Sequence, residues 1–280
     1  MSIKTVIKWI VPPILLLPFR RGYRPDGTTS WHRGDFPGWA EAVAAAKGYQ
    51  APNIMDIQRG AMRKVRVGKA VYERDSVLFD DIEYFFPTLA ALLLIASRNG
   101  NSLSVLDFGG ALGSSYYQNR GMLSHLARLS WHVVEQPHFV SAGQEEFQNE
   151  HLRFFPTIAE SCAAGHPDVV LLSSVLQYLE KPWDLLAQIA ARKPEYILVD
   201  RTPVLDGGRE RIVVQTVPPS IYPATYACRL FAPGAIEGAI ASDYELVYSF
   251  EAHAGTTIVV DKSVARYRGY FLKRRREGTA

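Results

Sequence analysis

The sequence predicts an α/β protein with a doubly wound, Rossmann-like sheet of mostly parallel strands, an antiparallel last strand and a helical N-terminal cap. Two observations support this prediction. Five strand-like segments alternate with helical segments between residues 101 and 200. After Asp200 the chain is poor in helix, and its last strand-like runs follow one another without a crossover helix. A parallel connection needs such a crossover, so the end of the chain is expected to pair antiparallel.

The strands of the parallel part are short apolar runs between polar turns. They are expected at Ser104–Phe108, Trp131–Pro137, Leu152–Pro156, Asp168–Ser174 and Glu195–Asp200. The fourth run, DVVLLSS, is apolar almost throughout, which is typical of a strand buried on both faces. The helices between them are expected at Ser114–Arg128, Val140–Asn149 and Pro182–Arg192, the last with its proline in the first turn.

The segments on either side of this core are less regular. Residues 201–228 are rich in Pro and Tyr, and within them Val217–Tyr226 is too irregular for a long element. A helix is expected at Pro233–Ile240. Three strand-like runs follow, at Tyr244–Phe250, Thr256–Val260 and Tyr267–Arg274. Upstream, helices are expected within Gly38–Tyr49, with a stop at Gly48, and within Phe79–Gly100. We therefore divide the chain into an arm (1–30), a helical cap (31–100) and a main domain (101–280).

Composition limits the kind of protein. The chain has 280 residues, of which 48% are hydrophobic and 21% are charged, as in soluble globular proteins. The net charge of +3 gives no reason to expect a nucleic-acid partner. Cys162 and Cys228 lack metal-ligand spacing, and the seven histidines are scattered, so no metal site is predicted. Two unpatterned thiols fit a reducing compartment and thus a cytoplasmic protein.

The N-terminal arm contains the apolar run WIVPPILLLPF, Trp9–Phe19. It has about half the roughly 20 residues of a membrane-spanning helix and is interrupted by prolines, so it is not expected to span a bilayer. The favoured interpretation is that it packs on the protein. The alternative is that residues 1–24 touch the inner membrane face peripherally, with Arg20, Arg21 and Arg24 facing anionic lipid.

The stretch VLDFGGALGSSYYQ, Val105–Gln118, predicts a strand, a glycine-rich turn and a helix. Its glycine spacing does not match the dinucleotide fingerprint, and it lacks the Gly-Lys-Ser/Thr end of a P-loop. Asp107 also places negative charge where a pyrophosphate would lie. S-adenosylmethionine instead brings an ammonium for the acid and a carboxylate for the helix N-terminus. Glu135, at the end of the second strand, is positioned to accept the ribose hydroxyls of a nucleoside.

These residues resemble a known superfamily. Val105–Gly113 resembles motif I of class I S-adenosylmethionine-dependent methyltransferases, VVEQP resembles their acidic motif after it, and Asp168–Pro182 resembles their fourth-strand segment. More narrowly, RDSVLFDDIEYF, LDFGGALGSSYYQNR, SSVLQYLEKP and VDRTP resemble a bacterial family of methyltransferase-like proteins often associated with surface-polysaccharide genes. This similarity runs over most of the chain from about Trp31. Ala111 departs from the general motif, which has glycine there.

The resemblance implies S-adenosyl-L-methionine as the cofactor and assigns residues to it. The expected cofactor-binding residues are Asp107, Gly109, Gly110, Gly113, Glu135, Gln136 and Ser173. Asp200 and Arg201 stand at the carboxyl end of the fifth strand, where open α/β sheets bind ligands. Asp200 is expected to accept a proton, and Arg201 to orient an anionic acceptor. The alternative for both is an ion pair with the helical cap.

Aromatic and cap residues complete the candidate site. Tyr178 is a third candidate catalytic residue, and with Gln215, Tyr222 and Tyr226 it predicts either a carbohydrate-stacking wall or ordinary packing. From the resemblance alone, Arg74 and Asp75 are expected to fold over the cofactor.

The function that follows is O-methylation of a glycan or polysaccharide precursor, with a small-molecule or glycan acceptor as the partner. The acceptor rests on family context only. Two alternatives stay open. One is a non-catalytic nucleoside-binding or scaffolding member of a polysaccharide assembly system. The other, weaker alternative is a nicotinamide oxidoreductase.

Overall fold

The computed structural model describes residues 28–29, 31–46, 53–74, 76–217, 224–252 and 257–276. Its centre is a nine-stranded sheet in the order β1-β13-β14-β9-β8-β5-β6-β7, with β12 also paired to β14. Five of these strands run parallel: β5 (Ser102–Phe108), β6 (Arg128–Val134), β7 (Leu152–Phe155), β8 (Val169–Ser173) and β9 (Tyr196–Leu205). The predicted doubly wound, mostly parallel sheet is confirmed.

The last strand, β14 (Ser263–Arg274), pairs antiparallel with β9 along nearly its whole length, as predicted. Its other edge is shared by two strands: β13 (Thr257–Val260) pairs with its first part and β12 (Tyr244–Glu251) with its second part. The short β1 (Thr28–Thr29) adds to β13 in parallel. A helix, α10 (Ala235–Ala239), precedes β12.

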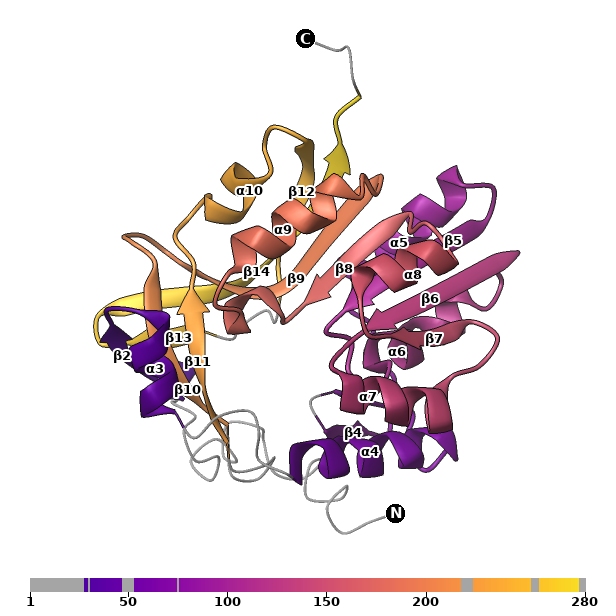
Figure 1. The fold of residues 1–280 in the computed structure, drawn as a ribbon, viewed down its shortest axis with the longest axis horizontal. Coiled ribbons are helices and arrows are strands. Elements are labelled where there is room, and N and C mark those ends of the chain that lie inside the picture. Colours follow the sequence, from indigo (N-terminus) through magenta and orange to yellow (C-terminus); the bar gives the residue numbers. More distant parts are fainter. Residues whose placement is uncertain are drawn as a thin grey trace, which may run out of the picture.

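Helices cover both faces of the sheet (Figure 1). On one face α5 (Phe86–Arg98) and α6 (Ser114–Leu123) bury a cluster that includes Leu92, Trp131 and Leu198. On the other face α8 (Ile158–Ala164) and α9 (Pro182–Ala191) bury a second cluster that includes Ile189 and Val199. Leu198 and Val199 are neighbours in β9 and lie in different clusters because successive strand side chains point to opposite faces. This strand is therefore buried on both faces of the sheet.

Three element boundaries differ from the prediction. The helix expected at Ser114–Arg128 ends at Leu123, where Ser124 Oγ donates a hydrogen bond to the carbonyl of Gly121 at 2.9 Å. The strand expected at Trp131–Pro137 starts earlier and ends at Val134, because its proline begins the next helix, α7 (Pro137–Ala142). A π-helical turn, Gly143–Phe147, continues α7, so this helix starts three residues earlier and ends two residues earlier than the predicted Val140–Asn149.

A second sheet lies after Asp200, in the segment for which the sequence predicted no strand. Here β9 continues to Leu205, and β10 (Arg211–Thr216) forms an antiparallel pair with β11 (Thr225–Leu230). The third strand is β2 (His32–Phe36), which lies on the other side of β10. Helix α3 (Trp39–Ala45) packs on this sheet through Ala42, which contacts Val214 and Ala227. These strands were not predicted because the partner strand β2 is far away in the sequence.

The segment expected as a helical cap, residues 31–100, is more varied than predicted. Its helices α3, α4 (Asn53–Arg66) and α5 are accompanied by β2 and by a hairpin of β3 (Tyr72–Arg74) and β4 (Val77–Phe79). The unpredicted helix α4 joins the two parts of the molecule, since Ile54 packs with Tyr226 of the second sheet while Met62 lies in the main core. The expected helix stop at Gly48 lies outside the described residues.

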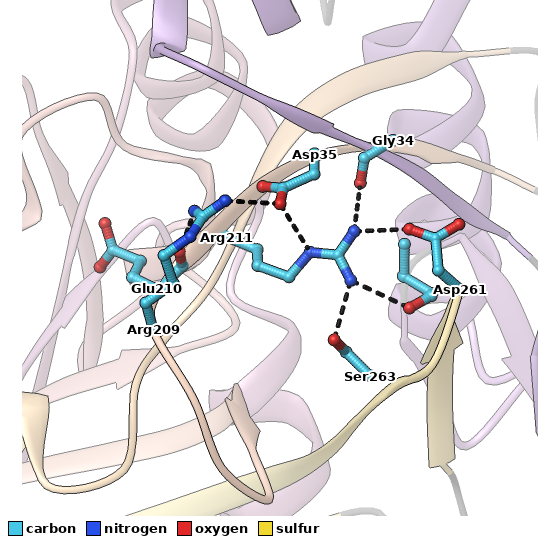
Figure 2. A network of polar contacts seen from close by, with 8 residues as sticks. Gly34, Asp35, Arg209, Glu210, Arg211, Asp261 and Ser263 are labelled. Atoms are coloured by element: carbon cyan, nitrogen blue, oxygen red, sulfur yellow. Dashed lines mark hydrogen bonds and ion pairs between the residues drawn. The ribbon is translucent and has the colours of Figure 1, made fainter.

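A buried arginine attaches the second sheet to the main one (Figure 2). The side chain of Arg211, on β10, is 9% exposed, and its Nε lies 3.5 Å from the Asp35 carboxylate. Its two terminal nitrogens donate to Gly34 O of β2 and to three acceptors around the β13–β14 turn: Val260 O, Asp261 Oδ2 and Ser263 Oγ. One guanidinium thus links β2, β10 and the β13–β14 turn. Among the described residues, no helix is long and apolar enough to cross a membrane.

Candidate functional site

The predicted polar residues gather at the carboxyl edge of the parallel strands. Asp107 is the penultimate residue of β5, Glu135 directly follows β6, and Ser173 ends β8. Asp200 pairs with Ser173 across the β8–β9 ladder. Open α/β sheets bind their ligands at this edge, so the structure places these residues where a ligand site is expected.

The glycine turn between β5 and α6 is shaped by positive φ angles. Gly109 has φ +72° and Gly113, which precedes α6, has φ +91°, a region that favours glycine. A Cβ at Gly109 would lie 2.7 Å from Val175 Cγ2, and one at Gly113 would lie 2.8 Å from Leu152 Cδ2. Ala111, the departure from the motif, also has positive φ, at +50°. The turn is therefore closely packed from within the protein.

Asp107 is a buried acid next to this turn. It is 1% exposed, and its Oδ2 accepts a hydrogen bond from Trp131 Nε1 at 3.0 Å. A Cβ at Gly110 would lie 2.6 Å from the carboxyl carbon of Asp107, so glycine is needed for the two to pack. Burial raises the pKa of Asp107 to about 7, while the Trp131 hydrogen bond and the charge of Arg201 act in the opposite direction. A ligand cation here would stabilise the ionised form.

Glu135 closes the other side of the turn. It is half-buried, and one carboxylate oxygen accepts a hydrogen bond from the backbone N–H of Gln136 at 2.6 Å. Burial raises its pKa, and backbone hydrogen bonds from Gln136 and Ala111 lower it. The Gln136 and His138 side chains are exposed at the start of α7. The carboxylate is thus fixed by backbone against the glycine turn.

Ser173, Asp200 and Arg201 form one hydrogen-bonded group. Ser173 Oγ donates to Asp200 Oδ2 at 2.8 Å and accepts from Arg201 Nε at 3.1 Å. Arg201 Nε lies 3.6 Å from the same carboxylate oxygen. The other oxygen, Asp200 Oδ1, is buried and has no hydrogen-bond partner within the described parts of the chain. Burial raises the pKa of Asp200, and the charge of Arg201 lowers it.

A β-bulge turns Asp200 and Arg201 toward the same side. In the β9–β14 ladder, Thr202 pairs with Arg268 and Val199 with Tyr270, so the two residues between them on β9 lie opposite a single residue on β14. Arg201 takes φ +49° at this point. Such a bulge interrupts the alternation of side chains along the strand.

A cavity of about 300 Å³ lies beside this group. Its wall is formed by residues within 74–88 of the expected cap, by α6 and by the carboxyl ends of β8 and β9. The lining residues include Arg74, Glu83, Ser115, Ser173, Asp200 and Arg201. Arg74, expected from the resemblance to cover the site, therefore lies at the same cavity as Asp200. Asp75 lies outside the described residues.

Tyr178 is not among the residues that line this cavity. Its hydroxyl donates a hydrogen bond to Gln215 Oε1 at 2.8 Å, and its ring meets Tyr226 edge-on at 5.7 Å. Tyr226 is 8% exposed and packs with Ile54 and Val217, so a carbohydrate-stacking surface at Tyr226 is wrong. Tyr222 lies outside the described residues. Tyr178 and Tyr226 instead pack with each other and with residues of the second sheet and α4.

Sequence reasoning missed an acid that anchors the β3–β4 hairpin. Glu73 is 3% exposed, and its carboxylate accepts hydrogen bonds from Ser114 Oγ and from the backbone N–H of Ser76. Because Ser114 is the first residue of α6, this contact holds the hairpin, with Arg74, next to the glycine turn. No local pattern identifies Glu73, since its partner is 41 residues away.

No set of three or more metal-ligating side chains occurs in the described part of the chain. The only cysteines, Cys162 and Cys228, are not joined in a disulfide.

Comparison with known proteins gives only distant structural likenesses. No protein-family model matches the chain, and no curated protein matches it. The N-terminal domain of EvdMO1, determined in the presence of SAH and D-fucose, is 14% identical, with 82% of this chain and 100% of that one covered and a TM-score of 0.46. The magnesium protoporphyrin IX methyltransferase ChlM from Synechocystis PCC 6803, with bound SAH, is 13% identical, with 79% and 94% covered and a TM-score of 0.45. The CcbJ methyltransferase from Streptomyces caelestis is 12% identical, with 76% and 96% covered and a TM-score of 0.45. Likenesses of this degree leave the function to be argued from the residues themselves.

Proposed function

We propose that this protein is an S-adenosylmethionine-dependent methyltransferase. The observation that carries the proposal is the buried carboxyl of Asp107 beside the glycine turn. Burial raises the pKa of this carboxyl to about 7, so a ligand with a positive charge would stabilise its ionised form. S-adenosylmethionine brings an ammonium and a sulfonium, whereas the pyrophosphate of a nicotinamide dinucleotide would add negative charge beside an acid.

Each part of the cofactor has a partner among the residues of this edge. Asp107 would hold the ammonium, Glu135 the ribose hydroxyls, and the backbone N–H groups that follow Gly113 the carboxylate. Gln136 and Ser173 are further candidate contacts. When bound, the cofactor supplies an electrophilic methyl group, and the protein has to align an acceptor and exclude water.

An oxygen acceptor is supported by Asp200. A hydroxyl needs a base as it reacts. Asp200 lines the cavity, and its Oδ1 accepts no hydrogen bond from any described residue. Ser173 and Arg201 hold the other oxygen, so the free one is fixed in place. Burial raises the pKa of this carboxyl, which makes it a stronger base than an exposed Asp.

The acceptor itself, a glycan or polysaccharide precursor, is proposed from the resemblance of the sequence. The arm of residues 1–24 lies outside the described residues, so its peripheral contact with the inner membrane face stays a prediction. A non-catalytic role in nucleoside binding is the second candidate, and Ala111 favours it. Ala111 has φ +50° and stands where the motif has glycine. Its Cβ would keep a ligand further from the backbone of the turn than glycine would.

Titration calorimetry with S-adenosylhomocysteine tests the proposal. The wild type should bind, and Asp107→Ala and Glu135→Ala should each bind about tenfold or more weakly, since each removes a charged hydrogen-bond partner. Asp184→Ala, an exposed acid in the first turn of α9, is the matched control and should bind like the wild type. No binding at high micromolar ligand, or wild-type binding by both site variants, would contradict the proposal. Binding without turnover of any acceptor would favour the second candidate.

A further inference from the structure

We infer that the cavity beside Asp200 takes an acceptor that carries an anionic group, a carboxylate or a phosphate, close to the hydroxyl that is methylated. This inference rests on the proposed methyltransferase function and adds the substrate class. For a glycan, the acceptors of this kind are uronates and sugar phosphates.

Two arginines from distant parts of the chain meet at this cavity. Arg74 comes from β3 and Arg201 from the bulge of β9. Both side chains are mostly covered, with 26% of Arg74 and 17% of Arg201 exposed. The charge of Arg74 lowers the pKa of Asp200, so the guanidinium lies within electrostatic reach of the carboxylate proposed as the base. Partly buried guanidinium groups are suited to carboxylates and phosphates, which they bind through two nitrogens.

The acids at the cavity do not satisfy Arg74 fully. Asp200 is held by Ser173 and Arg201, and in the described part of the chain Arg74 is paired with Glu83, at 3.7 Å. The Glu83 side chain is 63% exposed, and a partly solvated ion pair of this kind contributes little. The ring of Phe79, 5.1 Å from the guanidinium carbon, helps to hold Arg74 in place. An incoming anion can therefore replace Glu83 while Arg74 stays where it is.

A second observation is an acceptor, unpaired within the described chain, on a residue of the cavity wall. Asp200 is 5% exposed, and its Oδ1 is buried without a partner among the described residues. A hydroxyl that donates to this oxygen would satisfy it. The remaining wall suits a sugar, since Tyr84 and Phe85 provide apolar surface and Ser115 and Asn119 provide polar groups. A ligand that satisfies both Asp200 and Arg74 thus carries a hydroxyl and an anionic group close to each other.

Binding of three sugars to the protein saturated with S-adenosylhomocysteine tests the inference, by calorimetry or saturation-transfer NMR. D-glucuronate and D-glucose 6-phosphate should bind about tenfold or more tightly than D-glucose, and their order tells which anion fits. Glu83→Gln should tighten binding of the anionic sugars, because it removes the competing carboxylate. Arg74→Met should abolish the preference, and Arg74→Lys should keep part of it. Arg209→Met, whose side chain is 73% exposed and lies in the network of Figure 2, is the control and should change nothing.

A second arm separates the acceptor from the cofactor as the source of the anion. Arg74→Met should bind S-adenosylhomocysteine like the wild type. Weakened binding of S-adenosylhomocysteine, with unchanged binding of 5′-methylthioadenosine, would assign Arg74 to the carboxylate of the cofactor and overturn the inference. Equal binding of all three sugars by the loaded wild type, or binding of none, would also overturn it and leave the cofactor proposal intact. Failure of the wild type to bind S-adenosylhomocysteine would instead remove the proposed function.

Discussion

Replacing Asp107 with asparagine should stabilise the fold and weaken the cofactor site, and the stabilisation should grow with pH. Asp107 is 1% exposed, and burial raises its pKa from an ordinary 3.8 to about 7. A carboxyl with a higher pKa in the folded state binds its proton more tightly there than in the unfolded chain. Its favourable contribution is therefore complete below about pH 3.8 and is lost as the pH rises through about 7.

The size of the effect follows from the two pKa values. A pKa that rises from 3.8 to about 7 on folding lowers the free energy of unfolding by about 4 kcal/mol between low pH and pH 8. About 2 to 3 kcal/mol of this loss falls between pH 5 and pH 8. Asparagine is neutral and nearly isosteric, and its amide oxygen can still accept the hydrogen bond from Trp131 Nε1. The stability of Asp107→Asn relative to the wild type should therefore increase by about 2 to 3 kcal/mol over this pH range.

Urea denaturation followed by circular dichroism at pH 5, 6, 7 and 8 measures this difference. Asp184→Asn removes the same charge from an exposed position on α9 and serves as the control. The same Asp107→Asn protein should bind S-adenosylhomocysteine more weakly at pH 8, because the ligand ammonium loses its counter-charge. A stability difference that is constant from pH 5 to pH 8, or that is largest at pH 5, would refute the reasoning.

Two further substitutions test the packing around the site. Arg211→Met should lower the free energy of unfolding by about 2–4 kcal/mol, since it leaves the carbonyl groups of Gly34 and Val260 without their donor. A loss below about 1 kcal/mol by urea denaturation would contradict the network's role. Gly109→Ala should cost about 1–3 kcal/mol and weaken S-adenosylhomocysteine binding, because its φ is +72° and its Cβ would lie 2.7 Å from Val175 Cγ2. Adding Val175→Ala should restore only the part due to the close contact, and full recovery in the double variant would show that the backbone angle costs nothing.

The parallel core could be predicted because its signals are local. A run such as Asp168–Ser174 is apolar and bounded by polar residues, so the strand is evident without its partners. The second sheet gave no comparable signal, since β10 pairs with β2, about 180 residues earlier, and with β11 across a stretch rich in Pro and Tyr. Strand pairing over such distances depends on tertiary packing more than on local preference.

The candidate site divides in the same way. Asp107, Glu135 and Ser173 were identified because each stands at the end of an evident strand, and the topology of a parallel sheet brings strand ends together. Glu73 could not be found, because its role depends on how the β3–β4 hairpin packs on α6. Arg74 was expected only from the resemblance of the sequence, and its place at the cavity is a property of the folded hairpin.

The strongest link between fold and proposed chemistry is the bulge at the end of β9. In a regular strand, neighbouring side chains point to opposite faces, so Asp200 and Arg201 could not both face one cavity. The bulge, with Arg201 at φ +49°, removes this restriction and brings both side chains to the same wall. A non-glycine residue with such an angle costs about 1–2 kcal/mol. Strained residues of this kind concentrate at functional sites. The bulge therefore supports, independently of Asp107, a reactive acceptor site built on an acid and an arginine that are adjacent in the sequence.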